Sequence, residues 1–200
     1  YAWDMLTYEK LKREPRRFLA LTGLTHREFK TLLPAFVRAY QKLYPAEQTQ
    51  TGKTRERKTG GGRQTTLTSP EAQLLFVLVY QKAYALQIVH GELFGLGQSQ
   101  ANYWIHHLLP VLQAALDALG FAPEREGAQF AKHERKNKDR RDLIIDGTDR
   151  RRLRPKKPEK QALHYSGRKK AHTDKNVIIA TRSTKRIAFL STTEAGTVSD

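Results

Sequence analysis

One helical segment is apolar nearly all round, and it constrains the fold more than any other feature of the chain. Ser69 and Pro70 mark its start, because Pro is favoured at the first position of a helix. Residues 74–80 then contain no charged side chain. A helix that is apolar on every side has to be buried among other elements. The run is also far shorter than the roughly 20 apolar residues of a membrane span. It therefore predicts a helical bundle and no membrane partner.

A helix, a tight turn and a second helix are predicted over residues 86–109. Gly95 can adopt the left-handed conformation of the turn, and Gly91 leaves room for two helices to cross closely. Helical spacing turns four residues inward: Leu96, Ala101, Ile105 and Leu108. The residues expected to face outward are Gln98, Ser99, Gln100, Asn102, Tyr103 and His106. Asn and Gln can bond adenine in a major groove, and Ser or Tyr can hold phosphates. These six are candidate DNA contacts.

The distribution of charge leaves a second interpretation of this motif open. The chain carries 36 Lys and Arg against 20 Asp and Glu, a net charge of +16, which favours a polyanionic partner. Lys82 is nevertheless the only cation between residues 64 and 122, whereas residues 123–186 hold 21 basic and 9 acidic side chains. Phosphate neutralisation supplies much of DNA affinity. From spacing alone, plain helix packing is thus an alternative to DNA recognition. The linker cations Lys53, Arg55, Arg57, Lys58 and Arg63 could supply phosphate contacts.

The pattern changes from helices to strands after residue 141, which predicts an α+β fold. Short β-branched runs cover residues 143–145, 177–181 and 187–191, and the polar residues 182–186 suit a hairpin turn. The predicted organisation has five parts. They are an N-terminal helical region (1–44), a basic Gly-rich linker (45–66), the helix-turn-helix region (67–121), a polar connector (122–141) and a sheet domain (142–200). The helix of the N-terminal region begins at the capping box Thr25–Glu28 and contains Pro34.

Two aspartates in the sheet domain are candidate metal ligands. Asp146 follows the first apolar run, and Asp200 closes the chain. Two carboxylates brought together repel one another unless a cation lies between them, and Mg²⁺ suits such a pair. Spacing alone is weak evidence for a metal site and favours ordinary turn and N-cap aspartates. The cations between them, followed by Arg168, Lys169, Lys170 and His172, suit nucleic acid lying over a metal site. The chain has no cysteine, which excludes thiolate sites and disulfides.

Several motifs in residues 142–200 resemble the DDE-superfamily transposases of bacterial insertion sequences. They are Asp146-Gly147-Thr148, Arg154-Pro155, Tyr165-Ser166-Gly167-Arg168-Lys169-Lys170, His172-Thr173, Lys175-Asn176 and Gly196-Thr197-Val198-Ser199-Asp200. Residues 66–112 are similar to the helix-turn-helix that precedes the catalytic domain in those proteins. The resemblance implies a ribonuclease-H-like α/β catalytic domain, here incomplete, after the helix-turn-helix.

The resemblance also implies the chemistry. Asp146 and Asp200 would be the first two of three acidic ligands for two Mg²⁺ (or Mn²⁺) ions that cleave DNA at transposon ends and support strand transfer. Asp149 stands where the family often has Glu, and is expected to orient a neighbouring Arg. The family's Glu lies beyond residue 200, so we expect a truncated or partial copy with little activity alone.

The resemblance further implies double-stranded DNA as partner, a homo-oligomer and a bacterial cytoplasmic, nucleoid-associated location. Two other functions remain open from the sequence. One is a non-catalytic DNA-binding remnant that occupies transposon ends or inhibits a full-length transposase. The other is a general RNA-binding basic protein.

Overall fold

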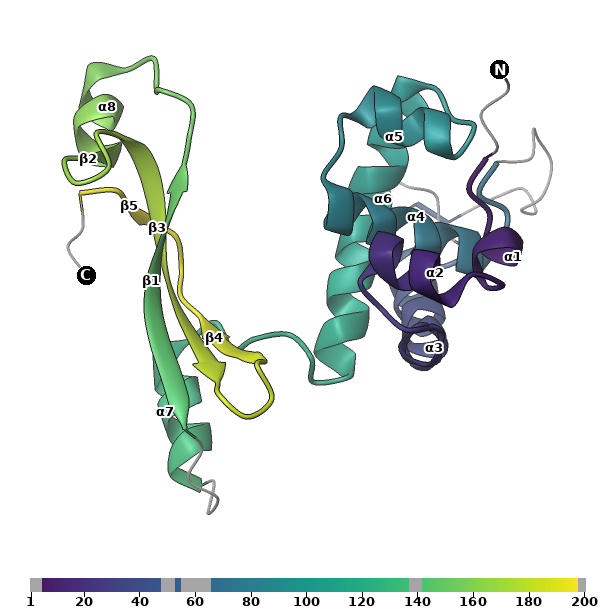
Figure 1. Cartoon of the computed structure of the whole chain (residues 1–200), viewed down its shortest axis with the longest axis horizontal. Helices are drawn as coiled ribbons and strands as arrows, with labels where there is room; N and C mark the ends of the chain where they lie inside the picture. The colour runs from purple at the N-terminus through teal and green to yellow at the C-terminus, as the bar shows by residue number, and fades with distance from the viewer. Residues whose placement is uncertain (1–4, 48–52, 55–65, 137–141, 198–200) are drawn as a thin grey trace. The chain divides into compact units, whose positions relative to one another are not determined.

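The chain forms two compact units, residues 1–121 and residues 122–200 (Figure 1). The structure, a computed structural model, describes residues 5–47, 53–54, 66–136 and 142–197. The first unit is helical and the second is built on an antiparallel sheet, which confirms the α+β prediction. We call them the helical unit and the sheet unit and describe each by itself. No helix in the described ranges is long and apolar enough to cross a membrane.

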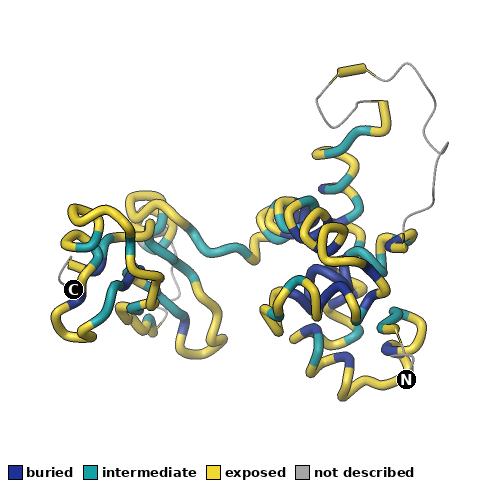
Figure 2. Tube along the Cα trace, turned by 90° about the horizontal axis from the view of Figure 1, so that it is seen from above, coloured by how far each residue is buried: buried dark blue, intermediate teal, exposed yellow. Residues whose placement is uncertain are grey.

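The helical unit is organised around the apolar segment of its fourth helix. Its elements are α1 (Tyr8–Leu11), α2 (Pro15–Thr22), α3 (His26–Leu43), α4 (Pro70–Ala83), α5 (Gln87–Leu93) and α6 (Gln98–Ala118). Every residue from Leu74 to Tyr80 is buried, and α4 contacts α1, α2, α3 and α6. Most buried segments, dark blue in Figure 2, lie in this unit. The predicted burial of the apolar segment of α4 on several sides is therefore confirmed.

Helix starts follow the capping residues that the sequence indicates. The Thr25 hydroxyl accepts from the Glu28 amide, and the Glu28 carboxylate accepts from the Thr25 amide at 2.7 Å, a complete capping box. The Ser69 hydroxyl accepts from the amide of Ala72 ahead of α4. Both α3 and α6 continue through an internal proline, Pro34 and Pro110 respectively. The packing around these helices thus outweighs the loss of one backbone hydrogen bond in each.

The turn between α5 and α6 depends on two glycines. Gly95 has φ of +67°, the left-handed region that favours glycine. Gly91 accepts a hydrogen bond from the Leu96 amide at 2.9 Å, and a methyl group on Gly91 would overlap the Leu96 carbonyl oxygen. It would also lie 3.3 Å from the Ala101 side chain of α6. The predicted close crossing at Gly91 is confirmed. The four residues predicted to face inward, Leu96, Ala101, Ile105 and Leu108, are all buried.

The sheet unit is organised around one long strand. Its elements are α7 (Gly127–Lys136), β1 (Leu143–Arg151), α8 (Pro158–His164), β2 (Tyr165–Ser166), β3 (Ala171–Thr181), β4 (Ile187–Leu190) and β5 (Glu194–Ala195). The other four strands all pair antiparallel with β3. The hairpin expected at residues 182–186 joins β3 to β4. β1 pairs without interruption from Leu143↔Thr181 to Arg151↔Thr173.

The polar stretch predicted to be a connector belongs to the sheet unit. The predicted connector 122–141 contains α7, and its first residues join the sheet unit. The Glu124 backbone bonds Ala188 and Leu190 of β4, each at 3.0 Å. The Phe130 ring of α7 lies 5.4 Å from that of Phe189. This aromatic contact, and His133 lying 3.9 Å from the Glu124 carboxylate, join a mostly polar helix to the rest of the sheet unit. The linker 45–66 lies largely outside the described residues.

The crossing of α5 and α6 generates the first prediction. Replacing Gly91→Ala should destabilise the helical unit by about 2–3 kcal/mol, because the new methyl forces backbone apart in a packed turn. Unfolding in urea, followed by Trp fluorescence, measures the loss. Gly97→Ala is the control, since its methyl meets no atom within 4 Å. It should cost less than half as much. Equal losses of unfolding free energy in Gly91→Ala and Gly97→Ala would contradict the claim that the close approach of α5 and α6 at Gly91 leaves no room for a side chain.

Candidate nucleic-acid interface

A polar stripe runs along the first half of α6. Gln98, Ser99, Asn102, Tyr103 and His106 follow one another at the spacing of one helix face, and all five are exposed. The opposite face of α6 is buried in the helical unit. The tight turn at residues 94–97 leaves the start of α6 accessible. This is the geometry in which the second helix of a helix-turn-helix enters a major groove.

Two of the candidate contacts also serve the local structure. Gln100 is exposed, but its side-chain oxygen accepts from the Gly97 amide at 3.3 Å and so helps to cap α6. Asn102 donates from Nδ2 to Oε1 of Gln87 at 3.0 Å. Gln87 begins α5, and the sequence analysis did not single it out. The Gln87 amide holds the Asn102 side chain in one orientation. The two residues are 15 positions apart and meet only because α5 crosses α6.

A stack of aromatic rings supports the same helix from α3. The His107 imidazole stacks on Tyr44 at 3.8 Å and on Tyr103 at 5.2 Å between ring centroids. The Tyr44 hydroxyl donates to the His107 carbonyl at 3.1 Å. Burial lowers the pKa of His107, so this imidazole is neutral at pH 7. The exposed Tyr103 thus stacks on an imidazole of its own helix, and that imidazole is covered by Tyr44 at the end of α3.

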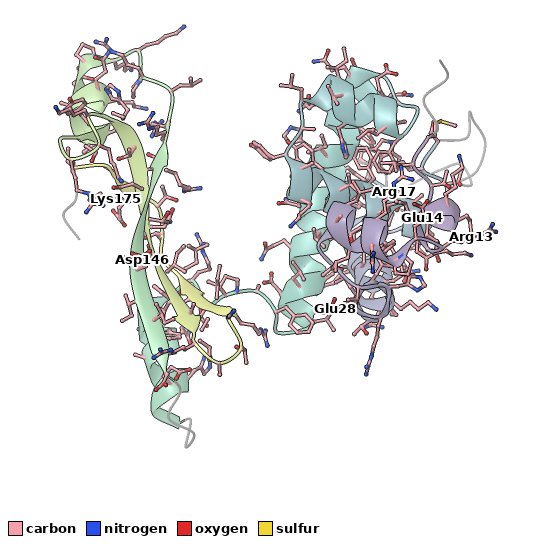
Figure 3. All side chains as sticks on the ribbon, in the orientation of Figure 1. Arg13, Glu14, Arg17, Glu28, Asp146 and Lys175 are labelled. Carbon is pink, nitrogen blue, oxygen red and sulfur yellow. The ribbon has the colours of Figure 1, made fainter. Side chains whose placement is uncertain are left out.

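The cations of the helical unit lie mainly outside α4–α6. Lys82 at the end of α4 remains the only Lys or Arg in those three helices. Arg13, Arg16 and Arg17 lie on or beside α2, where Arg17 pairs with Glu14 at 3.2 Å (Figure 3). Lys53 is exposed, and the other linker cations predicted to hold phosphates, Arg55, Arg57, Lys58 and Arg63, lie outside the described residues.

Asp146 lies in the middle of a strand, which corrects its expected place at a strand end. β1 runs five residues further, to Arg151, because the eleven-residue β3 offers backbone partners along its whole length. Figure 3 shows Asp146 on β1 and Lys175 on the neighbouring β3. Asp146 is exposed, so the desolvation cost expected for a buried strand-end carboxylate does not arise. Its proposed partner, Asp200, lies outside the described residues.

Asp149 is the buried acid of this strand. Its side chain is 8% exposed, Oδ1 has no hydrogen-bond partner, and Oδ2 lies 3.9 Å from Nη2 of Arg168. The arginine nearest to Asp149 by this distance is Arg168, and the expectation that Asp149 orients it stays a prediction. Arg168, Lys169 and Lys170 form the exposed turn of the β2–β3 hairpin, and His172 packs edge-on against Tyr165. Their contact with DNA stays a prediction.

The described residues contain no group of three or more His, Asp or Glu placed to hold a metal ion. The carboxylate of Asp146 is nevertheless of the ligand type that hard divalent cations prefer. The metal roles of Asp146 and Asp200 stay predictions.

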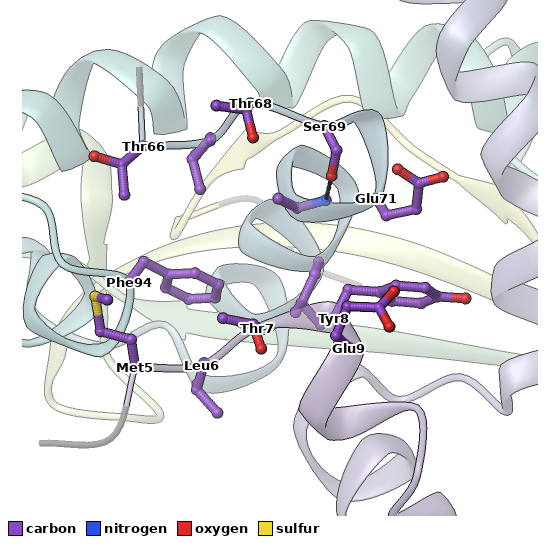
Figure 4. A pocket seen from close by; sticks show the side chains of 13 residues that line it. Met5, Leu6, Thr7, Tyr8, Glu9, Thr66, Thr68, Ser69, Glu71 and Phe94 are labelled. Carbon is purple, nitrogen blue, oxygen red and sulfur yellow. Dashed lines mark hydrogen bonds between the residues drawn. The ribbon is translucent and has the colours of Figure 1, made fainter. Parts of the chain in front are cut away.

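A cavity of about 470 Å³ lies in the helical unit, away from the polar stripe (Figure 4). It lies where the N-terminal segment meets the start of α4. Its lining combines apolar side chains such as Leu6, Leu67 and Phe94 with the acids Glu9 and Glu71. None of the candidate DNA contacts lines it. The cavity is therefore separate from the interface described above.

Residues 65–118 match the family described as the helix-turn-helix of DDE superfamily endonuclease. The match spans α4, α5 and α6, the three helices that form and support the polar stripe. No curated protein and no solved structure matches the chain. The match supports a transposase-like protein with a DNA-binding role for this segment.

His90 is the one buried imidazole in the helix-turn-helix, and it generates the second prediction. Its ring is fully buried between Phe76, Tyr80 and Phe94, and neither nitrogen makes a well-formed hydrogen bond. Burial lowers the pKa of His90 from 6.5 to about 4, opposed weakly by the Phe76 backbone. The unfolded chain therefore binds the proton first, and stability falls as pH drops from about 6.5 to about 4.

The expected loss is on the order of 3 kcal/mol over that range. Urea unfolding of the wild type and of His90→Leu from pH 7 to pH 4 measures it. The variant should lose most of the pH dependence between pH 7 and pH 5, whereas the exposed His106→Gln should keep it. A wild type as stable at pH 5 as at pH 7 would contradict the assignment.

Proposed function

We propose that this chain is a DDE-type transposase protein that binds the double-stranded ends of a transposon through the polar stripe of α6. The observation that supports this most is the stripe itself, five exposed polar side chains at the start of a helix in a segment similar to DDE endonuclease helix-turn-helix domains. The reading helix of such motifs contacts bases with its N-terminal residues. Action as a homo-oligomer on two ends is part of the proposal.

The stripe offers two kinds of contact to DNA. Gln98 and Asn102 carry amides that can donate to and accept from adenine, and each good bidentate pair contributes about 1–3 kcal/mol of discrimination. Ser99 and Tyr103 each carry a hydroxyl and His106 carries an imidazole N–H, all of which can donate to phosphate oxygens and so fix the position of the helix. Sequence preference would therefore reside in Gln98 and Asn102.

The sheet unit would carry the phosphodiester chemistry. Asp146 and Asp200 would hold Mg²⁺ or Mn²⁺, and the exposed Asp146 carboxylate is accessible to both a cation and DNA. A bound divalent ion would supply activation of water and charge stabilisation at the phosphate. In a ribonuclease-H-like domain further acidic ligands would complete the site. The β2–β3 turn cations Arg168, Lys169 and Lys170, with His172, would help to position phosphates.

Removing the two amides tests the role of α6. The double variant Gln98→Ala with Asn102→Ala should lose sequence preference by roughly 10- to 100-fold, because each amide contact is base-specific. Its affinity for unrelated duplexes should stay the same. The measurement is competition binding between a duplex selected by the wild type from a random library and an unselected one. Gln113→Ala, an exposed Gln further along α6, is the matched control and should change neither. Unchanged preference in the double variant would overturn the proposed role of the stripe.

Replacing Asp146→Ala tests the metal role independently of DNA binding. Mn²⁺ titration followed by electron paramagnetic resonance should show loss of a bound ion, because one carboxylate ligand is gone. Asp142→Ala, an exposed acid just before β1, should bind Mn²⁺ like the wild type. DNA affinity without added metal should be the same in all three proteins. Mn²⁺ binding that is identical in the wild type and Asp146→Ala would favour a non-catalytic DNA-binding role.

A further inference from the structure

The uninterrupted register of β1 and β3 places two arginines on the same face of the sheet as Asp146. Side chains alternate along a strand, so Arg150, four positions after Asp146, points to the same side. Arg152 continues the alternation beyond the strand end, where its amide donates to the His172 carbonyl at 2.9 Å. We call the side that carries Asp146, Arg150 and Arg152 the arginine face.

Arg150 is held in place by neutral groups. Its Nη2 donates to Oδ1 of Asn176 at 2.7 Å and lies 3.4 Å from Oγ1 of Thr193. Asn176 is 4% exposed and is itself anchored, because its Nδ2 donates to the carbonyls of Ser191 and Thr192 at 3.0 Å each. These neutral partners orient the guanidinium, and the acid opposite Arg150 in the register, Asp174, bonds Arg152. Both bonds involve Nη2, and a guanidinium has five N–H donors.

Arg152 is oriented by a charged group and stays accessible. Its Nη1 donates to Oδ1 of Asp174 at 2.8 Å and lies 3.1 Å from Nδ1 of His164. The same Asp174 oxygen lies 2.9 Å from Nδ1 of His164. The Arg152 side chain is still 36% exposed. Asp174 therefore balances part of the Arg152 charge and holds the guanidinium in place.

Arg168 of the β2–β3 turn lies near an acid, Asp149, on the face of β1 opposite the arginine face. Asp149 is three positions from Asp146, so the two side chains point to different faces of β1. Nη2 of Arg168 lies 3.9 Å from Oδ2 of this Asp149. The oriented cations nearest to Asp146 along its own face are therefore Arg150 and Arg152.

We propose that the arginine face binds the phosphate backbone of the DNA strand whose phosphodiester lies at Asp146. Oriented guanidinium groups suit phosphate because they can donate two parallel hydrogen bonds to it. Less side-chain entropy is lost on binding when the arginine is already fixed. The link to cleavage rests on the function proposed above, whereas phosphate binding by Arg150 and Arg152 does not.

Salt dependence tests the proposal in the full chain with a fluorescent duplex of mixed sequence. Arg150→Gln with Arg152→Gln should lower the slope of log affinity against log salt by about 2 and weaken binding roughly 10- to 100-fold at low salt. The control is Arg182→Gln with Lys185→Gln, two exposed cations of the β3–β4 turn. It should keep the wild-type slope. An unchanged slope in the arginine variant, or an equal fall in the control, would overturn the proposal.

Cross-linking gives a second measurement that does not remove the arginines. The chain has no cysteine, so a single one can be introduced and labelled with a photo-reactive group. Thr148→Cys lies on the arginine face between Asp146 and Arg150, and Val177→Cys lies on the opposite face at a residue 42% exposed. The same duplex should cross-link severalfold more to Thr148→Cys, and Arg150→Lys in that background should reduce the yield because lysine lacks the planar fork. Equal yields from both faces would contradict the proposal.

The two sets of variants separate this proposal from the function proposed for α6. Loss of Gln98 and Asn102 should alter sequence preference and leave the salt slope unchanged. Loss of Arg150 and Arg152 should alter the slope and leave the preference unchanged. Either proposal can therefore fail while the other stands.

Discussion

The close approach of α5 and α6 at Gly91 is the contact on which the polar stripe of α6 depends. The Leu96 carbonyl occupies the space where any larger residue at Gly91 would place its first carbon. This contact sets the angle at which α6 leaves the turn, so it decides which residues of α6 are buried and which are exposed. The all-apolar α4 then supplies the core against which both helices pack. The polar stripe is thus a consequence of packing on the other side of α6.

Charge and base-reading groups are divided between different parts of the chain. Helices α4–α6 carry one cation, whereas the sequence from residue 123 to residue 186 has a net charge of +12. Non-specific DNA affinity depends mainly on phosphate neutralisation. The stripe of α6 is therefore suited to selecting a sequence, and the cations outside α4–α6 to supplying affinity. With this division, the cations outside α4–α6 would keep the chain bound to DNA while α6 contacts different sequences in turn.

The sequence was most informative where local rules determine structure. Caps at Thr25 and Ser69, the apolar run of α4 and the two glycines around the turn correctly predicted the helices and the crossing of α5 and α6. The same approach missed α7, because this helix is largely polar and its contact through Phe130 is with Phe189, 59 positions further along the chain. It also ended β1 too early, since residues 147–151 are polar and pair only because β3 is long.

The side-chain networks of the sheet unit could not be predicted in the same way. The Arg150–Asn176 and Arg152–Asp174 bonds join residues 26 and 22 positions apart. They exist only in one strand register, and a shift of one residue would turn every side chain to the other face. Asp149 and Arg168 are a partial exception, because the resemblance to transposases suggested an arginine partner without indicating which one. Asn102 and Gln87 likewise meet only through the helix crossing.

A dimethyl sulfate footprint on a duplex selected by the wild-type chain tests the central claim most directly. The reagent modifies N7 of guanine in the major groove and N3 of adenine in the minor groove. The duplex is chosen to carry guanines immediately beside the adenines of the selected site. If α6 inserts its polar stripe into the major groove, N7 of these guanines should be protected within one short site. Mutation of Gln98 and Asn102 should remove that protection. Protection confined to adenine N3, or no protection on a duplex that the chain binds selectively, would contradict the account.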